Sequence, residues 1–316
     1  MINSDYKYTS IYKNIEDFIP QKESTYIYGY SPEGRSHFVD ELIKKFSKDI
    51  KFVELALLET EHDIIEDKNS NAKYSLRSTK DINELLDFYD SQVIYIDITG
   101  LNNRITASLL NHSIRRQEVR YGLVNVVYAE PKHYKVSEFK TEGYFYDLSE
   151  KIQGIEPLPG FANIIPDDDD IRFIPLLGFE GGRFTHIVET VQPPTDHIYP
   201  IIGVPGFRAE YPFVAYWGNR QSLGNANSWP NVKYAVANSI VDIYMILLKT
   251  LKKNPSAKIK LAPIGTKPHV IGAILFAIKY KRQVEIIYDN PKRKKTRTSG
   301  VGLIVNCCVS KLLQEN

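Results

Sequence analysis

Two segments of the sequence follow the same plan, and this repetition most constrains the fold. In residues 93–131, a short apolar stretch ends in Thr-Gly, a helical segment follows, and a second apolar stretch ends in Tyr-x-x-Pro. Residues 259–291 repeat this order, with Gly265 after the first stretch and Tyr288 opening the closing motif. Short apolar runs without polar alternation are typical of strands buried on both faces of a parallel sheet. The repeat predicts Rossmann-like βαβ units.

Length and composition agree with two such lobes. The chain has 316 residues, with 43% hydrophobic and 25% charged residues, which are ordinary globular values. We predict an α/β protein of two Rossmann-like parallel-sheet lobes in tandem. The expected parts are an N-terminal tail at 1–21, a first lobe at 22–150, a connector at 151–171 and a second lobe at 172–316.

Hydrophobic periodicity places the individual elements. Residues 60–78 are expected to be irregular, and residues 209–230 are expected to form a loop rich in Pro, Gly, Asn and aromatics. The acidic run 167–170 reads as a solvated loop, because it lacks the glycine and ligand spacing of a calcium loop. The pattern predicts strands at 25–29, 52–58, 93–98, 124–128, 173–179, 199–204, 258–263, 284–288 and 301–305, and helices at 36–48, 81–90, 103–116, 183–191, 233–252 and 268–280.

Charge and cysteine usage exclude several classes of protein. Forty basic residues against 38 acidic residues give a net charge of +2, which argues against a broad polyanion-binding surface. The two cysteines, Cys307 and Cys308, are adjacent, so a disulfide framework and a structural zinc site are not expected, and we predict no metal and no cofactor. Without a long apolar segment or an apolar signal region, a reduced cytoplasmic protein that makes no membrane contact is expected.

The strongest candidate for a ligand-binding site follows the predicted strand at 258–263. Ligands of parallel α/β sheets bind beyond the carboxyl ends of the strands, where helix N-termini offer free N–H groups. Gly265, Thr266, Lys267 and His269 combine a glycine for close approach, a hydroxyl, a cation and an imidazole, a set that suits a phosphate. The spacing is not that of a Walker A loop. The alternative is an ordinary βα turn with a solvated lysine.

Further candidate contacts follow other predicted strands. In the first lobe, the alternative for Asn103 is a plain helix cap. In the second lobe, Phe207 or Trp217 could stack on a base, and the alternative is a surface loop held together by its aromatics. The predicted ligand contacts in these turns are Ser31, Arg35, Thr99, Gly100, Asn103, Gly178, Arg208 and Arg220.

Signals for catalysis are weak. The GxSxG, HExxH and GxGxxG motifs are absent, and Glu180 and His269 are the best candidates for an acid or base. The cysteines are expected to pack in a strand. A run of basic residues comprises Lys292, Arg293, Lys294, Lys295 and Arg297. We predict that this run either binds polyanions, including nucleic acid, or forms a solvated loop.

The sequence around Ile264-Gly265-Thr266-Lys267-Pro268 resembles the Gly-Thr-Lys-Pro core of CARF domains, Rossmann-like sensors of cyclic oligonucleotides in prokaryotic immunity. In that family the motif ends a strand and opens a helix. The segment 97–100 looks like the start of the same motif, and Ser31-Pro32 stands where CARF domains contact ligand. A chain with two such lobes, at about 22–131 and 172–305, is similar to SAVED sensors of anti-phage systems. The family usually has two glycines where Ile264-Gly265 stands.

The resemblance implies a nucleotide- or cyclic-oligonucleotide-binding sensor or regulatory subunit of a bacterial defence system. We expect no effector domain within these residues, so the expected partner is a separate effector protein or further copies of the chain itself. One alternative is an enzyme acting on a nucleotide or nucleic-acid phosphate, including one that cleaves its own ligand. The other is a non-catalytic scaffold subunit of a defence complex.

Overall fold

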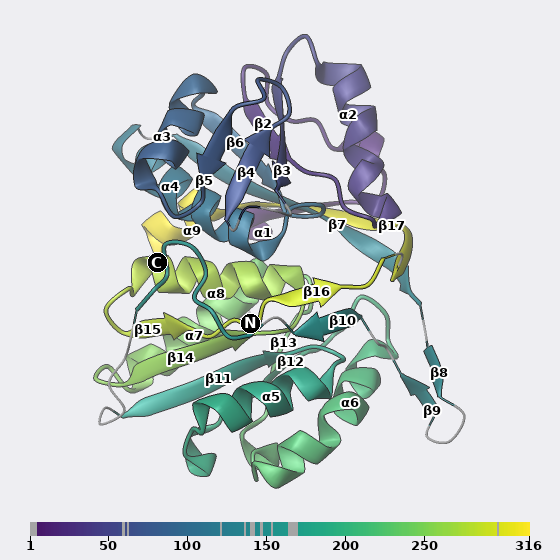
Figure 1. Ribbon diagram of the computed structural model, residues 1–316, viewed down its shortest axis with the longest axis vertical. Coiled ribbons are helices and arrows are strands. Elements are labelled where there is room, and N and C mark those ends of the chain that lie inside the picture. The colour runs from purple at the N-terminus through teal and green to yellow at the C-terminus, as the bar shows by residue number, and fades with distance from the viewer. Residues whose placement is uncertain are drawn as a thin grey trace. The chain divides into compact units, whose positions relative to one another are not determined.

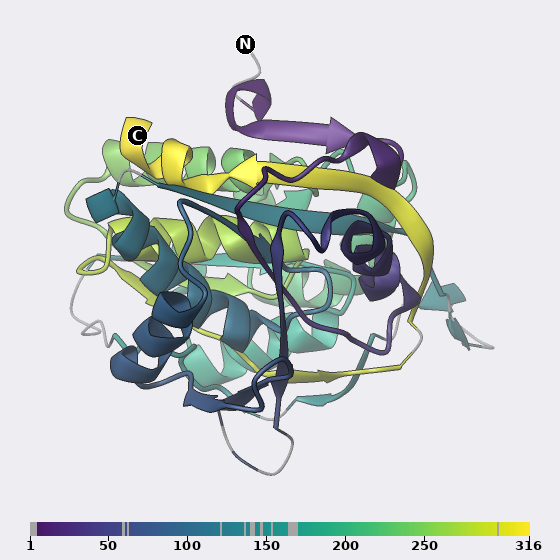
Figure 2. The same cartoon turned by 90° about the horizontal axis from the view of Figure 1, so that it is seen from above.

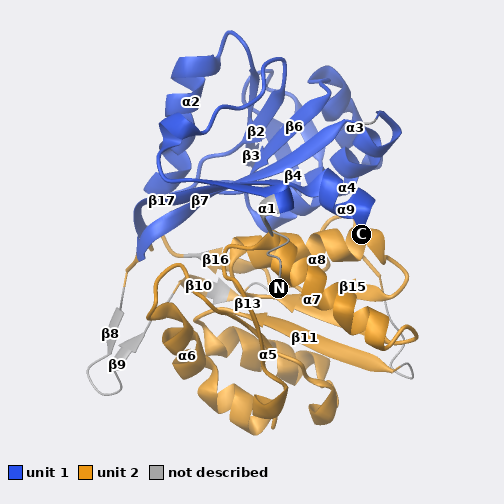
Figure 3. Cartoon of the chain, turned by 180° about the vertical axis from the view of Figure 1, so that it is seen from behind, with its two compact units in different colours: residues 1–133, 298–316 blue, residues 134–297 orange. Residues whose placement is uncertain are grey.

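The computed structural model describes residues 5–58, 61, 63–120, 122–135, 137–139, 143–145, 148–152, 154–163, 170–295 and 297–316 (Figure 1). Two compact units divide the chain. Unit 1 comprises Met1–His133 and Thr298–Asn316, and unit 2 comprises Tyr134–Arg297 (Figure 3). Both contain parallel strands joined through helices, so the prediction of a Rossmann-like α/β fold is confirmed. In the part of the chain that is described, no helix is long and apolar enough to cross a membrane.

Unit 1 is built around a mixed sheet with the strand order β1-β17-β7-β6-β2-β3-β4-β5. The central strands β7, β6, β2 and β3 are parallel, and the strands outside them are antiparallel at β1, β4 and β5. The strand order reverses between β2 and β6. The bounds are β1 (Thr9–Tyr12), β2 (Thr25–Tyr28), β3 (Lys51–Leu57), β4 (Ile64–Asp67), β5 (Lys73–Ser75), β6 (Val93–Asp97), β7 (Leu123–Tyr134) and β17 (Thr298–Cys308).

Helices cover both faces of this sheet. Tyr26, Tyr95 and Val127 project from one face into a cluster with Val39 and Leu42 of α2. Side chains alternate along a strand, so the intervening buried residues face the opposite side, where α4 contacts β6. Figure 2 shows α2 apart from α3 and α4, with strands between them. The helices are α1 (Asp5–Tyr8), η1 (Ile15–Asp17), η2 (Gly34–Phe38), α2 (Val39–Phe46), α3 (Thr79–Phe88), α4 (Asn103–Arg120) and α9 (Val309–Glu315).

Unit 2 contains a parallel sheet with the order β13-β12-β11-β14-β15. The chain moves outward from β11 through β12 to β13, then crosses to β14 and β15, so the order reverses between β11 and β14. Two short antiparallel pairs, β8 with β9 and β10 with β16, accompany it. The bounds are β8 (Ser137–Phe139), β9 (Gly143–Phe145), β10 (Ser149–Ile152), β11 (Ile171–Leu177), β12 (Ile201–Gly203), β13 (Lys233–Ala235), β14 (Lys258–Pro263), β15 (Val284–Ile286) and β16 (Pro291–Arg293).

The sheet of unit 2 is sandwiched between two helix pairs (Figure 1). Phe173 and Leu177 of β11 pack in one cluster with Phe184 of α5 and Leu223 of α6. On the other face, α7 and α8 pack on each other and contact β13, β14 and β15. The helices are α5 (Gly181–Val191), η3 (Thr195–His197), α6 (Tyr211–Asn225), η4 (Trp229–Asn231), α7 (Ile240–Lys253) and α8 (Lys267–Lys279).

Three predicted segments were wrong. Residues 60–78 contain the antiparallel strands β4 and β5, and residues 209–230 contain α6. The helix predicted at 233–252 is instead the short strand β13 followed by α7, which begins after the cap Ser239. The strand β13 has only three residues, which is too short for a periodic pattern. The helix α6 contains glycines and asparagines, whose low helix propensity indicates a loop.

The domain boundaries also differ from the prediction. The N-terminal segment is not a tail, because β1 pairs with β17 and Phe18 is buried in the core of unit 1. Residues of the expected connector pack within unit 2, where Leu158 is buried and Glu156 bonds to Tyr288. The C-terminal strand β17 belongs to unit 1, so the chain passes between the units twice. Of the acidic run, residues 167–169 lie outside the described residues.

Candidate functional site

Pairs of glycines meet where the strand order reverses. In unit 1, a Cβ on Gly100 would lie 1.6 Å from the carbonyl oxygen of Gly29. In unit 2, a Cβ on Gly265 would lie 2.9 Å from the carbonyl oxygen of Leu177, and one on Gly178 3.0 Å from that of Ile264. These glycines are required because the ends of two neighbouring strands approach each other. Their close packing is therefore explained without a ligand.

A buried arginine lies next to the glycine pair of unit 2. Arg183, in the first turn of α5, donates to both carboxylate oxygens of Asp289 at 2.7 and 2.6 Å and to the carbonyl oxygen of Ile264 at 3.1 Å. Burial lowers the pKa of Arg183, but the bonds to Asp289 outweigh it and the pKa is raised. This pair joins the carboxyl ends of β14 and β15 to α5.

The first turn of α8 forms the edge of the predicted phosphate site. Lys267 is partly exposed at the first helical position. The hydroxyl of Thr266 faces inward, donating to the carbonyl of Ala237 at 2.7 Å and accepting from the N–H of His269. Among the described residues, the backbone N–H groups of Gly265 and Thr266 have no hydrogen-bond partner. What this turn can offer an anion is backbone N–H groups and the Lys267 cation.

The two candidate catalytic residues, His269 and Glu180, both form hydrogen bonds within unit 2. His269 is fully buried, its Nε2 bonds to the carbonyl of Val236 at 3.0 Å, and burial lowers its pKa to about 4. The carboxylate of Glu180 accepts from the N–H of Leu148 and the hydroxyl of Ser149, each at 3.0 Å. The neutral imidazole of His269 therefore holds a backbone carbonyl, and the carboxylate of Glu180 holds the start of β10. Both side chains have structural roles.

The corresponding side chains of unit 1 are also buried. Arg35 is 2% exposed and donates to Glu33 at 2.7 Å and to the carbonyl of Ala129 at 2.5 Å. The hydroxyl of Thr99 accepts from the N–H of Ala129. In this conformation, neither side chain has appreciable surface for a ligand.

Asn103 and Ser31 have local surroundings that sequence reasoning did not anticipate. Asn103 is buried at the start of α4, and the helix is capped by its neighbour Asn102, whose side chain accepts from the N–H of Ile105 at 2.9 Å. The plain-cap alternative was therefore wrong for Asn103. Ser31 bonds within its own turn, to Ser36 and to the N–H of Glu33.

Arg208 and Arg220 are on the surface of unit 2. Arg208 forms an ion pair with Glu210 at 2.5 Å. Arg220 of α6 is exposed, with its guanidinium 3.9 Å from the centre of the Trp217 ring. Because Trp217 lies on a helix rather than in a loop, Arg220 and Trp217 occupy one exposed helical face.

The predicted basic run is divided by the fold. Residues 291–293 form β16, so the expected loop is partly a strand. Lys292 pairs with Glu150 at 3.2 Å, Arg297 is buried, and Lys295 is exposed. The role of this run in binding polyanions stays a prediction.

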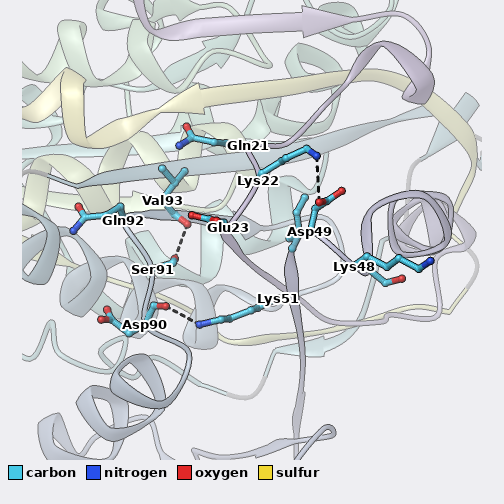
Figure 4. A pocket seen from close by; sticks show the side chains of 12 residues that line it. Gln21, Lys22, Glu23, Lys48, Asp49, Lys51, Asp90, Ser91, Gln92 and Val93 are labelled. Carbon is cyan, nitrogen blue, oxygen red and sulfur yellow. Dashed lines mark hydrogen bonds and ion pairs between the residues drawn. The ribbon is translucent and has the colours of Figure 1, made fainter.

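Among the described residues of unit 1, two hollows lie away from the carboxyl edge of the strands. The larger, of 740 Å³, lies at the amino ends of β2, β3 and β6, where Lys22 pairs with Asp49 and Lys51 donates to the carbonyl of Asp90 (Figure 4). The smaller, of 380 Å³, lies between α3 and α4. Both mix cations with carboxylates, so they carry no strong preference for one ligand charge. Among the described residues, no group of three acidic, His or Cys side chains could hold a metal ion.

An ion-pair network at the carboxyl edge of unit 1 escaped prediction. Asp63 accepts hydrogen bonds from Arg104 and Arg77, at 2.5 and 2.6 Å. Burial alone would raise the pKa of Asp63, but the two arginines lower it below its ordinary value. No sequence signal pairs Asp63 with Arg104, because 41 residues separate them.

Comparison with known proteins gives no family for this chain. No protein-family model matches it, and no curated protein matches it in sequence. Among solved structures, it is similar to a GDP-L-fucose synthetase from Naegleria fowleri, with 9% identity, a TM-score of 0.22, and coverage of 95% of this chain and 89% of that chain. This likeness carries no argument about function. The α/β class rests on the strands and helices of the chain itself.

Proposed function

We propose that this protein is a nucleotide-binding sensor or regulatory subunit made of two tandem Rossmann-like units that resemble CARF domains. We place it in the cytoplasm, in a bacterial defence system, with a cyclic oligonucleotide or nucleotide as ligand and an effector protein or further copies of itself as partner. The resemblance around Gly265-Thr266-Lys267-Pro268 supports the ligand class.

One structural observation carries the binding role. The first turn of α8 follows β14 at the point where the strand order of unit 2 reverses, and it combines the N–H groups of Gly265 and Thr266 with Lys267. Ligands of open parallel sheets bind at such points, and a helix N-terminus attracts phosphate. The anion would be bound by backbone N–H groups and one cation, without the Thr266 hydroxyl, which donates to the carbonyl of Ala237.

Calorimetric titration with cyclic oligonucleotides and common mononucleotides tests this role. We expect Lys267→Ala to weaken binding at least tenfold, since a charge-assisted phosphate contact is lost. Lys279→Ala is the matched control, because Lys279 is exposed in the last turn of the same helix, where the dipole does not favour anions. Equal affinity of the wild type and Lys267→Ala would exclude this site.

The enzymatic alternative finds less support. His269 and Glu180 each bond to other groups of unit 2, and no contact joins them to each other in the described structure. Incubation with the same nucleotides followed by chromatography separates the two functions. Intact ligand is expected from a sensor, and converted ligand from an enzyme.

A further inference from the structure

An exposed aromatic surface covers the outer face of α6 and the neighbouring edge of the sheet. Phe213 is 74% exposed, Tyr234 53%, Trp217 50% and Trp229 40%, although such rings are usually buried. The rings of Tyr216 and Trp229 stack with centres 5.8 Å apart and planes 7° apart, and the hydroxyl of Tyr216 donates to that of Tyr234. We call these five residues the aromatic surface.

A cluster of cations lies next to it, at the amino ends of the strands of unit 2. Arg172 and Lys233 both lie 5.5 Å from the centre of the Tyr199 ring. The ammonium of Lys233 also donates at 3.3 Å to Thr250 of α7, which stands between Lys249 and Lys253. We call Arg172, Lys233, Lys249 and Lys253 the basic cluster.

Among the described residues, the basic cluster has more cations than carboxylates paired with them. Asp170 pairs with Arg172 at 3.2 Å, but among the described residues no carboxylate forms an ion pair with Lys233, Lys249 or Lys253. The pKa of Lys233 is lowered by burial and then by repulsion from the other cations of the cluster. An anion placed here would relieve this repulsion.

The edge strand β13 brings the two surfaces together. Lys233 and Tyr234 are consecutive, so their side chains point to opposite faces of the sheet. Lys233 reaches α7, whereas Tyr234 reaches Tyr216 of α6. Because β13 is the last strand on its side of the sheet, a ligand lying across its edge meets cations on one side and aromatic rings on the other.

We propose that this edge of unit 2 binds single-stranded nucleic acid, with phosphates on the basic cluster and bases stacked on the aromatic surface. Proteins that bind single strands without sequence preference combine these two elements, since every base has a face that stacks. A protein partner could cover the aromatic surface, but it would have no general use for the three neighbouring lysines, which form no ion pair with a described carboxylate. The basic cluster lies at the amino ends of the strands, whereas the proposed nucleotide site at α8 follows the carboxyl end of β14, so this proposal does not depend on that site.

Fluorescence anisotropy with labelled dT12 and U12 at several salt concentrations tests this proposal. Lys249→Glu with Lys253→Glu should weaken binding at least tenfold and flatten the salt dependence, because each lost phosphate contact removes about 0.7 from the slope of log K against log salt. Trp217→Ala and Tyr234→Ala should each weaken binding about fivefold or more with an unchanged slope, because stacking releases no counterions.

The charge control is Lys281→Glu with Arg282→Glu, which makes the same change in net charge at exposed positions before β15, the opposite edge strand of the sheet. This control should bind like the wild type, and melting temperatures show that each variant is folded. No binding by the wild type at 50 mM salt, or equal weakening by the control, would overturn the proposal. Loss of dT12 binding with normal binding of mononucleotides at Lys267 would separate this site from the one at α8.

Discussion

Arg183 and Asp289 form a buried two-bond ion pair that joins the start of α5 to the segment after β15. Unit 1 contains an equivalent contact. Arg35 follows β2 in unit 1, just as Arg183 follows β11 in unit 2. Arg35 donates to the carbonyl of Ala129. Ala129 and Asp289 hold the same place in the repeat, directly after the tyrosine of the Tyr-x-x-Pro motif. The repeat visible in the sequence therefore corresponds to a repeated tertiary contact, with a carbonyl in one unit and a carboxylate in the other.

Removing one partner of the Arg183–Asp289 pair should destabilise the protein strongly. We expect Arg183→Met to lower the free energy of unfolding by about 3–5 kcal/mol, because Asp289 would remain buried and unpaired. Arg183→Met with Asp289→Leu should cost clearly less than the sum of the two single changes. Urea unfolding of the four proteins measures the coupling, and additive losses would contradict it.

The adjacent glycines of α5 should respond oppositely to alanine. A Cβ on Gly181 would lie 1.9 Å from the carbonyl of Gly218 in α6, so Gly181→Ala should destabilise by about 3 kcal/mol or more. A Cβ on Gly182 meets nothing within 4 Å, so Gly182→Ala should stabilise by about 0.5–1 kcal/mol. Thermal unfolding compares the two variants, and similar melting temperatures would show that α5 and α6 do not pack this closely.

Acid should destabilise the protein partly through Asp63. Its native pKa is lowered by Arg104 and Arg77, so its contribution is present above the unfolded pKa of about 3.9 and is lost as the pH falls through the lower native value. Asp63→Asn should cost most at pH 7, about 3 kcal/mol, and the cost should become smaller as the pH falls below the unfolded pKa of about 3.9. Urea unfolding between pH 7 and pH 2.5 gives both values. A difference that is constant over this range would rule out the ion pair.

His269 should make stability depend on pH in a higher window. Burial lowers its native pKa to about 4, against about 6.5 when unfolded, so the unfolded chain binds more protons between these values. Stability is therefore expected to fall by about 3 kcal/mol as the pH decreases from 6.5 to 4. His269→Gln should remove this pH dependence of the unfolding free energy. His37→Gln is the control, and it should leave the pH dependence unchanged because His37 is exposed. The pH dependence of the unfolding free energy distinguishes them.

The elements with strong local signals were predictable. The strand β6 is apolar up to Asp97, and β14 is apolar apart from its two lysines. Each strand is followed by a glycine turn, and the helices α4 and α8 begin within a few residues of the expected positions. The cap of α4 was not predictable, because Asn102 and Asn103 are equivalent in sequence. The helix α6 was not predictable, because it lacks an apolar stripe. The aromatic Trp217 was recognised as a candidate, but its place on a helical face was not.

The sequence by itself determined that the chain forms parallel βαβ layers, since buried strands and glycine turns are local properties of short segments. Only the tertiary structure decided where those segments pair. It placed β17 in the sheet of unit 1, closed Arg183 onto Asp289, and brought Lys233 next to Lys249 and Lys253. These contacts join residues far apart in the chain, and their energies depend on burial and distance, which no local pattern records.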